Sequence, residues 1–144
     1  MAGELLVGFG ALFVALAFGL TPAMTVFIGR MAFEKLEEEA AKSFLRASFP
    51  IYHAMQIGCC VVAGLALATQ RPIDAGIMGA VAFIGLFAWL WLMPIAHRLD
   101  GLKLAGQDVA KDLLQIQGRS SFIIVAQLAA MATVVVRLAI VPTP

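Results

Sequence analysis

Residues 120–141 read SSFIIVAQLAAMATVVVRLAIV and contain one charged residue, Arg137, near the end of the stretch. The hydrocarbon core of a bilayer is about 30 Å thick, and an α-helix of about 20 apolar residues crosses it. A helix is favoured there because it satisfies its backbone hydrogen bonds within the segment. The stretch is therefore predicted to be a membrane-spanning helix.

Three other segments have the same length and apolar character: residues 5–29, 49–69 and 76–96. None of them carries a charge in its central part. A short polar connection that contains Pro72 separates the last two, and a proline cannot continue the helix before it, so these two helices are predicted to form a tight antiparallel hairpin. We therefore predict an all-α protein: an integral membrane four-helix bundle, built as a single domain over residues 1–144.

The composition excludes several other classes of protein. Of the 144 residues, 62% are hydrophobic and 13% are charged, about half of the charged share in soluble domains, so a water-soluble globule is excluded. The net charge is +1, which leaves no basic excess for nucleic acid. Cys59 and Cys60 are adjacent and cannot form the spaced disulfide framework of a small secreted protein.

Basic residues are concentrated in two of the connections. Residues 30–48 and residues 98–119 each contain four of the ten Lys and Arg residues, and with four spans both connections lie on the same side of the membrane. The positive-inside rule places this side in the cytoplasm and both termini outside. Apolar residues recur there at helical spacing, so both connections are predicted to be amphipathic cytoplasmic loops that lie in the membrane interface. The expected location is the inner (plasma) membrane of a bacterium.

Polar residues form a stripe at the cytoplasmic start of the second span. His53, Gln56 and Cys60 fall at positions i, i+3 and i+7 and share one helix face. His97 ends the third span and is predicted to lie at the same level as His53. Two facing imidazoles can hold a haem iron, and histidine with a thiolate can hold a soft metal such as copper(I). The alternative is that both histidines are interfacial residues with hydrated tips and that the protein binds no cofactor.

Two polar residues interrupt the fourth span. Arg137 lies about a turn and a half from the outer end, close enough for its side chain to extend to the membrane surface. Gln127 lies deeper and is predicted to hydrogen-bond to a neighbouring helix, in the first or second span. Tyr52 of the second span is predicted to be an interfacial aromatic anchor.

Small residues and prolines predict where the helices pack and bend. Four small residues of the first span recur at four-residue spacing, which is typical of close helix contacts in lipid: Ala11, Ala15, Gly19 and Ala23. Pro22 is expected to kink this helix, with the hydroxyl of Thr21 as a substitute hydrogen-bonding group. Pro50 is expected in the first turn of the second span, where its missing N–H has no helical partner.

The sequence contains none of the motifs that we would expect of an enzyme. It has no Gly-x-Ser-x-Gly elbow, no phosphate-binding glycine-rich loop and no His-Glu-x-x-His helix. Every Asp and Glu is predicted to lie outside the spans, so an intramembrane hydrolase or proton pump would lack its acid. A non-enzymatic protein is therefore expected.

Several elements occur in an order that resembles a known family. Residues 25–29 (TVFIG) end the first span, residues 49–53 (FPIYH) open the second, residues 93–95 (MPI) end the third, and residues 117–121 (QGRSS) precede the fourth. This order is similar to that of the TMEM205-like family, also called the DUF4149 domain, over nearly the whole chain. Gln117 occupies a position where many members carry histidine. The resemblance implies a four-span membrane protein and supplies no catalytic residues.

These features together predict a transport or accessory component of the membrane. Its partners would be the lipid bilayer, a second copy of the chain or another membrane protein, and not nucleic acid. Two alternatives stay open. One is a haem- or soft-metal-binding protein that uses His53 and His97, and the other is a structural subunit of a larger membrane complex.

Overall fold

The computed structural model describes residues 2–104 and 110–140, without the side chains of residues 96, 97, 100, 103, 104, 110, 113 and 117. These residues form helices and short connections and contain no strand. The elements in chain order are α1 (Ala2–Pro22), η1 (Ala23–Ile28), α2 (Gly29–Lys35), α3 (Glu38–Leu67), α4 (Pro72–Phe87), η2 (Ala88–Leu92), α5 (Met93–Leu104) and α6 (Ala110–Ile140). The two η elements are π-helical.

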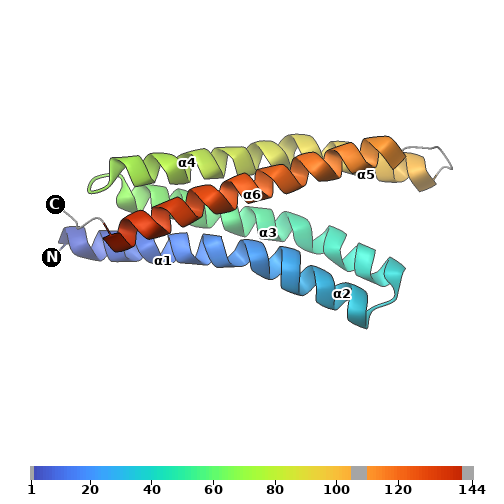
Figure 1. Cartoon of the computed structure of the whole chain (residues 1–144), viewed down its shortest axis with the longest axis horizontal. Helices are drawn as coiled ribbons and strands as arrows, with labels where there is room; N and C mark the ends of the chain where they lie inside the picture. The colour runs from blue at the N-terminus through green and yellow to red at the C-terminus, as the bar shows by residue number, and fades with distance from the viewer. Residues whose placement is uncertain (1, 105–109, 141–144) are drawn as a thin grey trace.

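Four long helical stretches of the described chain lie side by side (Figure 1). The first is α1 with η1 and α2, the second is α3, the third is α4 with η2 and α5, and the fourth is α6. Each contains a segment long and apolar enough to cross a membrane: Ala2–Lys35, Glu38–Leu67, Pro72–Ile95 and Leu114–Ile140. Both α1 and α4 contact α3 and α6, so the four stretches form a ring. The predicted all-α membrane bundle is confirmed.

The described parts of the two charged connections are largely helical extensions of the spans, whereas the sequence predicted amphipathic loops that lie in the membrane interface. α2 continues the first stretch to Lys35, and α3 begins at Glu38. In the second connection, α5 runs to Leu104 and α6 begins at Ala110. A helix of 31 residues such as α6 is about 46 Å long at 1.5 Å per residue, so it extends beyond a hydrocarbon core of about 30 Å.

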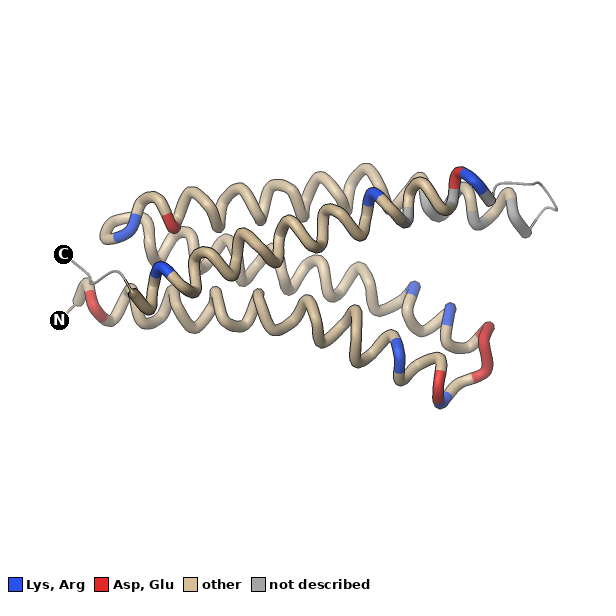
Figure 2. The backbone as a smooth tube through the Cα atoms, viewed as in Figure 1, with Lys and Arg blue, Asp and Glu red and all other residues tan. Residues whose placement is uncertain are grey.

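Charged residues explain why these extensions are helical. Glu38 and Glu39 lie in the first turn of α3, where carboxylates interact favourably with the helix dipole. Nζ of Lys42 lies 2.7 Å from a carboxylate oxygen of Glu38, a spacing of four residues that stabilises a helix by a few tenths of a kcal/mol, about 0.2–0.5 kcal/mol. Figure 2 shows the charged residues gathered toward the two ends of the bundle, with the apolar spans between them.

Pro22 and Pro94 each lie beside a π-helical segment. Proline lacks an N–H, and its ring clashes with the carbonyl four residues earlier, which disturbs regular α-helical bonding. η1 follows Pro22, and η2 precedes Pro94. The hydroxyl of Thr21 donates to the backbone oxygen of Ala17 at 3.3 Å, next to the disturbed turn. Pro50 lies inside α3, so the prediction that it opens a span is wrong, because the helix has already begun at the charged extension.

The closely packed core lies in the half of the bundle nearer the termini. All four stretches contribute buried side chains to it: Val14, Ala17, Cys60, Ala63, Leu67, Met78, Val81, Ala82, Met131 and Val134. α1 approaches α3 closely at Gly10, where an added Cβ would lie 2.8 Å from Cγ of Leu67. Glycine is therefore required for this contact, because a larger residue would push against a fully buried side chain.

The small residues of α1 pack through a different face from the predicted one. The buried residues of α1 are Gly10, Val14, Ala17 and Thr21. Ala15 and Gly19, two members of the predicted stripe, are exposed. Residue size alone did not distinguish the two faces, whereas the close approach at Gly10 and the hydroxyl of Thr21 both lie on the buried one.

A buried carboxylate joins the α3–α4 hairpin to α6 near the termini. Asp74, in the first turn of α4, is 1% exposed. Nε of Arg137 donates to its Oδ1 at 2.5 Å, and Nη1 of Arg71 donates to its Oδ2 at 3.4 Å. The same Nη1 also donates to the backbone oxygen of Arg137 at 3.0 Å. Two predictions are thereby corrected: Asp74 lies within a spanning helix, and Arg137 pairs inside the bundle because a carboxylate faces it there.

We expect Asp74→Asn to destabilise the protein by about 3 kcal/mol, because two guanidinium groups would lose the carboxylate between them. The estimate is at the low end for a broken buried pair because Arg137 is 35% exposed. Glu34→Gln is the matched control, since the side chains of its pair with Arg30 are 52% and 79% exposed, and such pairs contribute about 0–1 kcal/mol. The measurement is thermal unfolding in detergent, and equal midpoints for the two variants would contradict the prediction.

Candidate functional site

A cluster of buried polar side chains joins α1 to α3. Thr21, Tyr52 and Gln56 are exposed by only 0%, 3% and 1%. Oη of Tyr52 lies 3.1 Å from Oγ1 of Thr21, and Nε2 of Gln56 lies 3.2 Å from the same oxygen. The prediction that Tyr52 is an interfacial anchor is wrong, because its hydroxyl finds a partner inside the bundle.

The directions of these hydrogen bonds follow from the available hydrogens. An amide NH₂ group only donates, and a threonine hydroxyl has one hydrogen and two lone pairs. Thr21 donates its hydrogen to the backbone oxygen of Ala17, so it accepts from both Tyr52 and Gln56. The hydroxyl of Thr21 is therefore fully used, and it fixes two side chains of α3 against α1.

Two buried atoms beside this cluster have no hydrogen-bond partner among the described residues: Oε1 of Gln56 and Nδ1 of His53. The two residues lie on successive turns of α3, on neighbouring parts of one face. More than about 90% of buried polar groups in proteins are hydrogen-bonded, so two vacant positions in one place are unusual. One is an amide oxygen that accepts and the other is a ring nitrogen of the imidazole, and both are buried.

Gln127 connects α6 to α4 and is 3% exposed. Its Nε2 donates to the backbone oxygen of Val81 at 3.1 Å and would lie 3.2 Å from a Cβ added to Gly85. A bond to a neighbouring helix was predicted, but the partner helix is the third span and not the first or second. The absence of a side chain at Gly85 explains the approach, since it leaves room for the amide.

Between the α4–η2–α5 stretch and α6, close packing ends at the level of Gly85 and Gln127. Past these residues, none of the described side chains in residues 86–102 and 111–126 is buried. In Figure 1, the α2–α3 side and the α5–α6 side diverge toward the end of the bundle away from the termini. We call residues 86–102 and 111–126 the open half, and the packed part that contains the core and Asp74 the closed half.

The predicted pairing of His53 with His97 requires that both lie at one level. A Cβ added to Gly85 would meet Ile57 at 3.3 Å, and because α3 and α4 are antiparallel this contact places His53 level with Trp89. His97 belongs to α5, eight residues further along, or about 12 Å at 1.5 Å per residue. The two backbones are therefore not at the same level, and the side chain of His97 lies outside the described part of the structure.

Cys60 belongs to the packed core and lies apart from His53. It is fully buried among apolar side chains and is seven residues from His53, about 10 Å along the helix. Among the described residues, no group of three or more His, Cys, Asp or Glu side chains is placed to hold a metal ion. The predicted stripe thus splits into a core residue, Cys60, and the polar pair His53 and Gln56.

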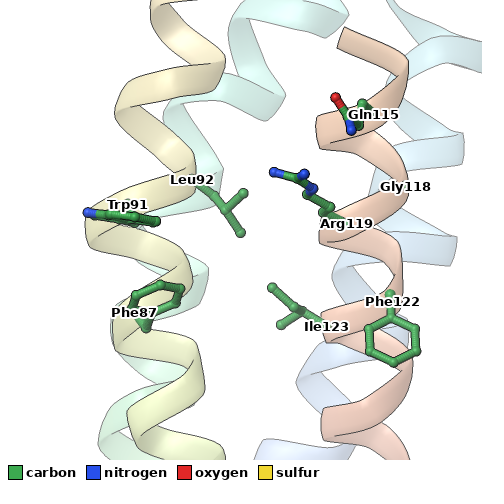
Figure 3. Close-up of a pocket in the computed structure, with 8 residues that line it drawn as sticks. All are labelled: Phe87, Trp91, Leu92, Gln115, Gly118, Arg119, Phe122 and Ile123. Carbon is green, nitrogen blue, oxygen red and sulfur yellow. The ribbon is translucent and has the colours of Figure 1, made fainter. Parts of the chain in front are cut away.

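An open groove of about 520 Å³ lies between α4–η2 and α6, on the open half (Figure 3). Its lining consists of Phe87, Trp91, Leu92, Gln115, Gly118, Arg119, Phe122 and Ile123. Figure 3 shows Leu92, Arg119 and Ile123 extending into the space between the two helices. Arg119 was not among the predicted site residues, although it is the last charge before the uncharged residues 120–136, and this position is the signal that could have identified it.

One family model matches this chain. The family model described as "Domain of unknown function (DUF4149)" matches residues 12–103, more than half of the chain. The chain belongs to the DUF4149 family. The match includes the elements TVFIG, FPIYH and MPI on which the resemblance was based, whereas residues 117–121 lie outside the matched range. No curated protein and no solved structure matches the chain.

We expect Thr21→Val to lower the free energy of unfolding by about 2 kcal/mol or more, because two buried donors lose their acceptor and each such loss costs about 1–3 kcal/mol. Thr133→Val is the matched control: Thr133 is exposed and bonds only within its own helix, to the backbone oxygen of Ala129 at 2.9 Å. Its effect should stay within about 0.5 kcal/mol. Unfolding in detergent measures both, and a Thr21→Val protein as stable as the control would show that the cluster does not hold α1 to α3.

Proposed function

We propose that this DUF4149 protein is a non-enzymatic accessory or transport component of a bacterial inner membrane, and that it acts by binding other membrane components through its open half. The observation that carries the proposal is the end of close packing at Gly85 and Gln127. In the described residues beyond that level, two stretches of apolar helix lie together without burying side chains between them.

The closed half favours the accessory role over transport by a lone chain. Leu67, Met78 and Met131 are fully buried in its centre, and Asp74 joins two arginines at its end. Protein interiors of this kind are packed as densely as organic crystals. A solute that crossed the membrane here would need a path formed with a second molecule, so binding to another membrane component is the simpler role.

Gln56 and His53 are polar residues of α3 at the depth where the open half begins. Polar groups inside a membrane are costly unless they face protein or water, and they commonly mark functional positions. By the positive-inside rule, the open half lies toward the cytoplasm and the termini lie outside. We propose that a cytoplasmic-side partner, either a second copy or another membrane protein, binds the open half from this depth outward.

Photo-crosslinking from two matched positions tests this function. Leu90 and Phe83 are seven residues apart on nearly the same face and are 63% and 70% exposed, but only Leu90 lies in the open half. A photoreactive residue at position 90 should give a discrete crosslinked product in the membrane. The crosslinked partner should copurify with the protein in mild detergent. A photoreactive residue at position 83 should give much less crosslinked product. Equal crosslinking at both positions, or a purified monomer with no adduct, would contradict the proposal.

A second candidate, a haem or soft-metal protein, is favoured by one observation only, the unpartnered Nδ1 of His53. It is weakened by the different levels of His53 and His97. We expect the purified protein to show neither a stoichiometric metal by mass spectrometry nor a Soret band. A metal or haem signal that disappears in His53→Ala would instead make this a cofactor protein with His53 as a ligand.

A further inference from the structure

Arg119 lies at a depth that corresponds to one surface of the hydrocarbon core. It precedes Arg137 by eighteen residues of one continuous helix, which is about 27 Å at 1.5 Å per residue. This length is close to the hydrocarbon thickness of about 30 Å. Arg119 also directly precedes the uncharged residues 120–136, so we infer that it lies near the boundary of the apolar region opposite the Asp74–Arg137 pair, within reach of lipid phosphates.

The other cations at this end of the bundle lie further out. Arg119 lines the same groove as Trp91 and Leu92, so these residues share a level, and Arg98 on α5 is six residues beyond Leu92, about 9 Å along the helix. Arg119 also forms no ion pair with any side chain that the structure describes. It is a cation at the boundary of the apolar region, and no carboxylate among the described side chains pairs with it.

The groove beside Arg119 is apolar and is open toward the surrounding lipid. Phe87, Phe122 and Ile123 line it on the side of Arg119 nearer the middle of the bundle, and Leu92 faces Arg119 from the opposite helix (Figure 3). In Figure 3, Arg119 lies at one end of these apolar side chains and extends toward the facing helix. A cation followed by an apolar channel is complementary to a molecule with an anionic head and a hydrocarbon tail.

We propose that this groove binds one anionic phospholipid, with its phosphate at the guanidinium of Arg119 and an acyl chain along the groove toward Phe87. Arginine is suited to this role because its planar group donates two parallel hydrogen bonds to phosphate oxygens. The inference uses the proposed function only for the orientation, which places Arg119 in the cytoplasmic leaflet, where anionic lipids attract basic residues.

Native mass spectrometry tests the proposal on the full chain. The protein is equilibrated in detergent with equal amounts of phosphatidylglycerol and phosphatidylcholine that carry the same acyl chains, and the retained lipid is counted. The wild type should retain phosphatidylglycerol in preference, and Arg119→Gln should reduce that preference about tenfold. Arg98→Gln is the matched control, since it removes the same charge from the same end outside the groove and should leave the preference unchanged.

Two further variants separate the contributions of head and tail. Arg119→Lys keeps the charge and should restore part of the preference. A Cβ added to Gly118 would meet no atom within 4 Å, so Gly118→Leu can fill the groove without a clash at that atom and should reduce the retention of both lipids. An anion held at Arg119 alone would not need the groove. A lower retention of both lipids in Gly118→Leu would therefore show that the lipid occupies the groove.

Several results would overturn the proposal. These are a wild type with no preference, equal losses in Arg119→Gln and Arg98→Gln, or complete displacement of the lipid by inorganic phosphate, which would show an anion site without a tail. Crosslinking from Leu90 reports on the protein partner and does not require Arg119. A failure of the lipid site can therefore be told apart from a failure of the proposed function.

Discussion

Hydrogen bonds between buried polar side chains hold these four helices in register. Lipid tails are as apolar as the side chains, so burial of apolar surface gives little drive for helices to associate within a membrane, and packing and polar contacts decide the arrangement. Buried hydrogen bonds supply this here at two depths: Asp74 with Arg137 near the termini, and, near the middle of the bundle, Gln127 with the backbone of Val81 and Thr21 with α3. They join α4 to α6 and α1 to α3, and the short connection between α3 and α4 links the two pairs.

The same contacts explain why the α4–η2–α5 stretch and α6 pack closely over only part of their length. The side-chain bonds between them, at Asp74 and Gln127, lie between the termini and the level of Gly85, and no side-chain hydrogen bond joins described residues 86–102 to described residues 111–126. In a membrane, apolar helices without such contacts gain little by closing on one another. The open half is therefore a stable arrangement in lipid, and its surfaces can accept another molecule at little cost.

The sequence predicted the features that depend on one segment alone, and it did not predict the features that depend on how the helices pack. Four long apolar segments require four helices, because helix is what satisfies the backbone in lipid, and this prediction was correct. The position of Arg137 did not reveal its partner, because Asp74 is 63 residues away in the chain and its distance depends on helix packing. The predictions for Tyr52 and for the small residues of α1 were wrong for the same reason. The rotation of a helix about its axis decides which face is buried, and lipid-facing and protein-facing positions are both apolar.

The π-helical segments indicate that the open half is built into the backbone. η1 begins two residues after Thr21, which bonds to Gln56, and η2 begins three residues after Gly85, so both irregular segments start near the level where close packing between α4 and α6 ends. π-helical bonding is rare and occurs frequently at functional sites, and both segments lie beside prolines, which remove one α-helical hydrogen bond. Two stretches that lie on opposite sides of α3 thus change their backbone pattern at one depth. We infer that the sequence specifies the divergence of the helices at this depth. Oε1 of Gln56 and Nδ1 of His53, the two buried atoms without a hydrogen-bond partner among the described residues, lie at the same depth.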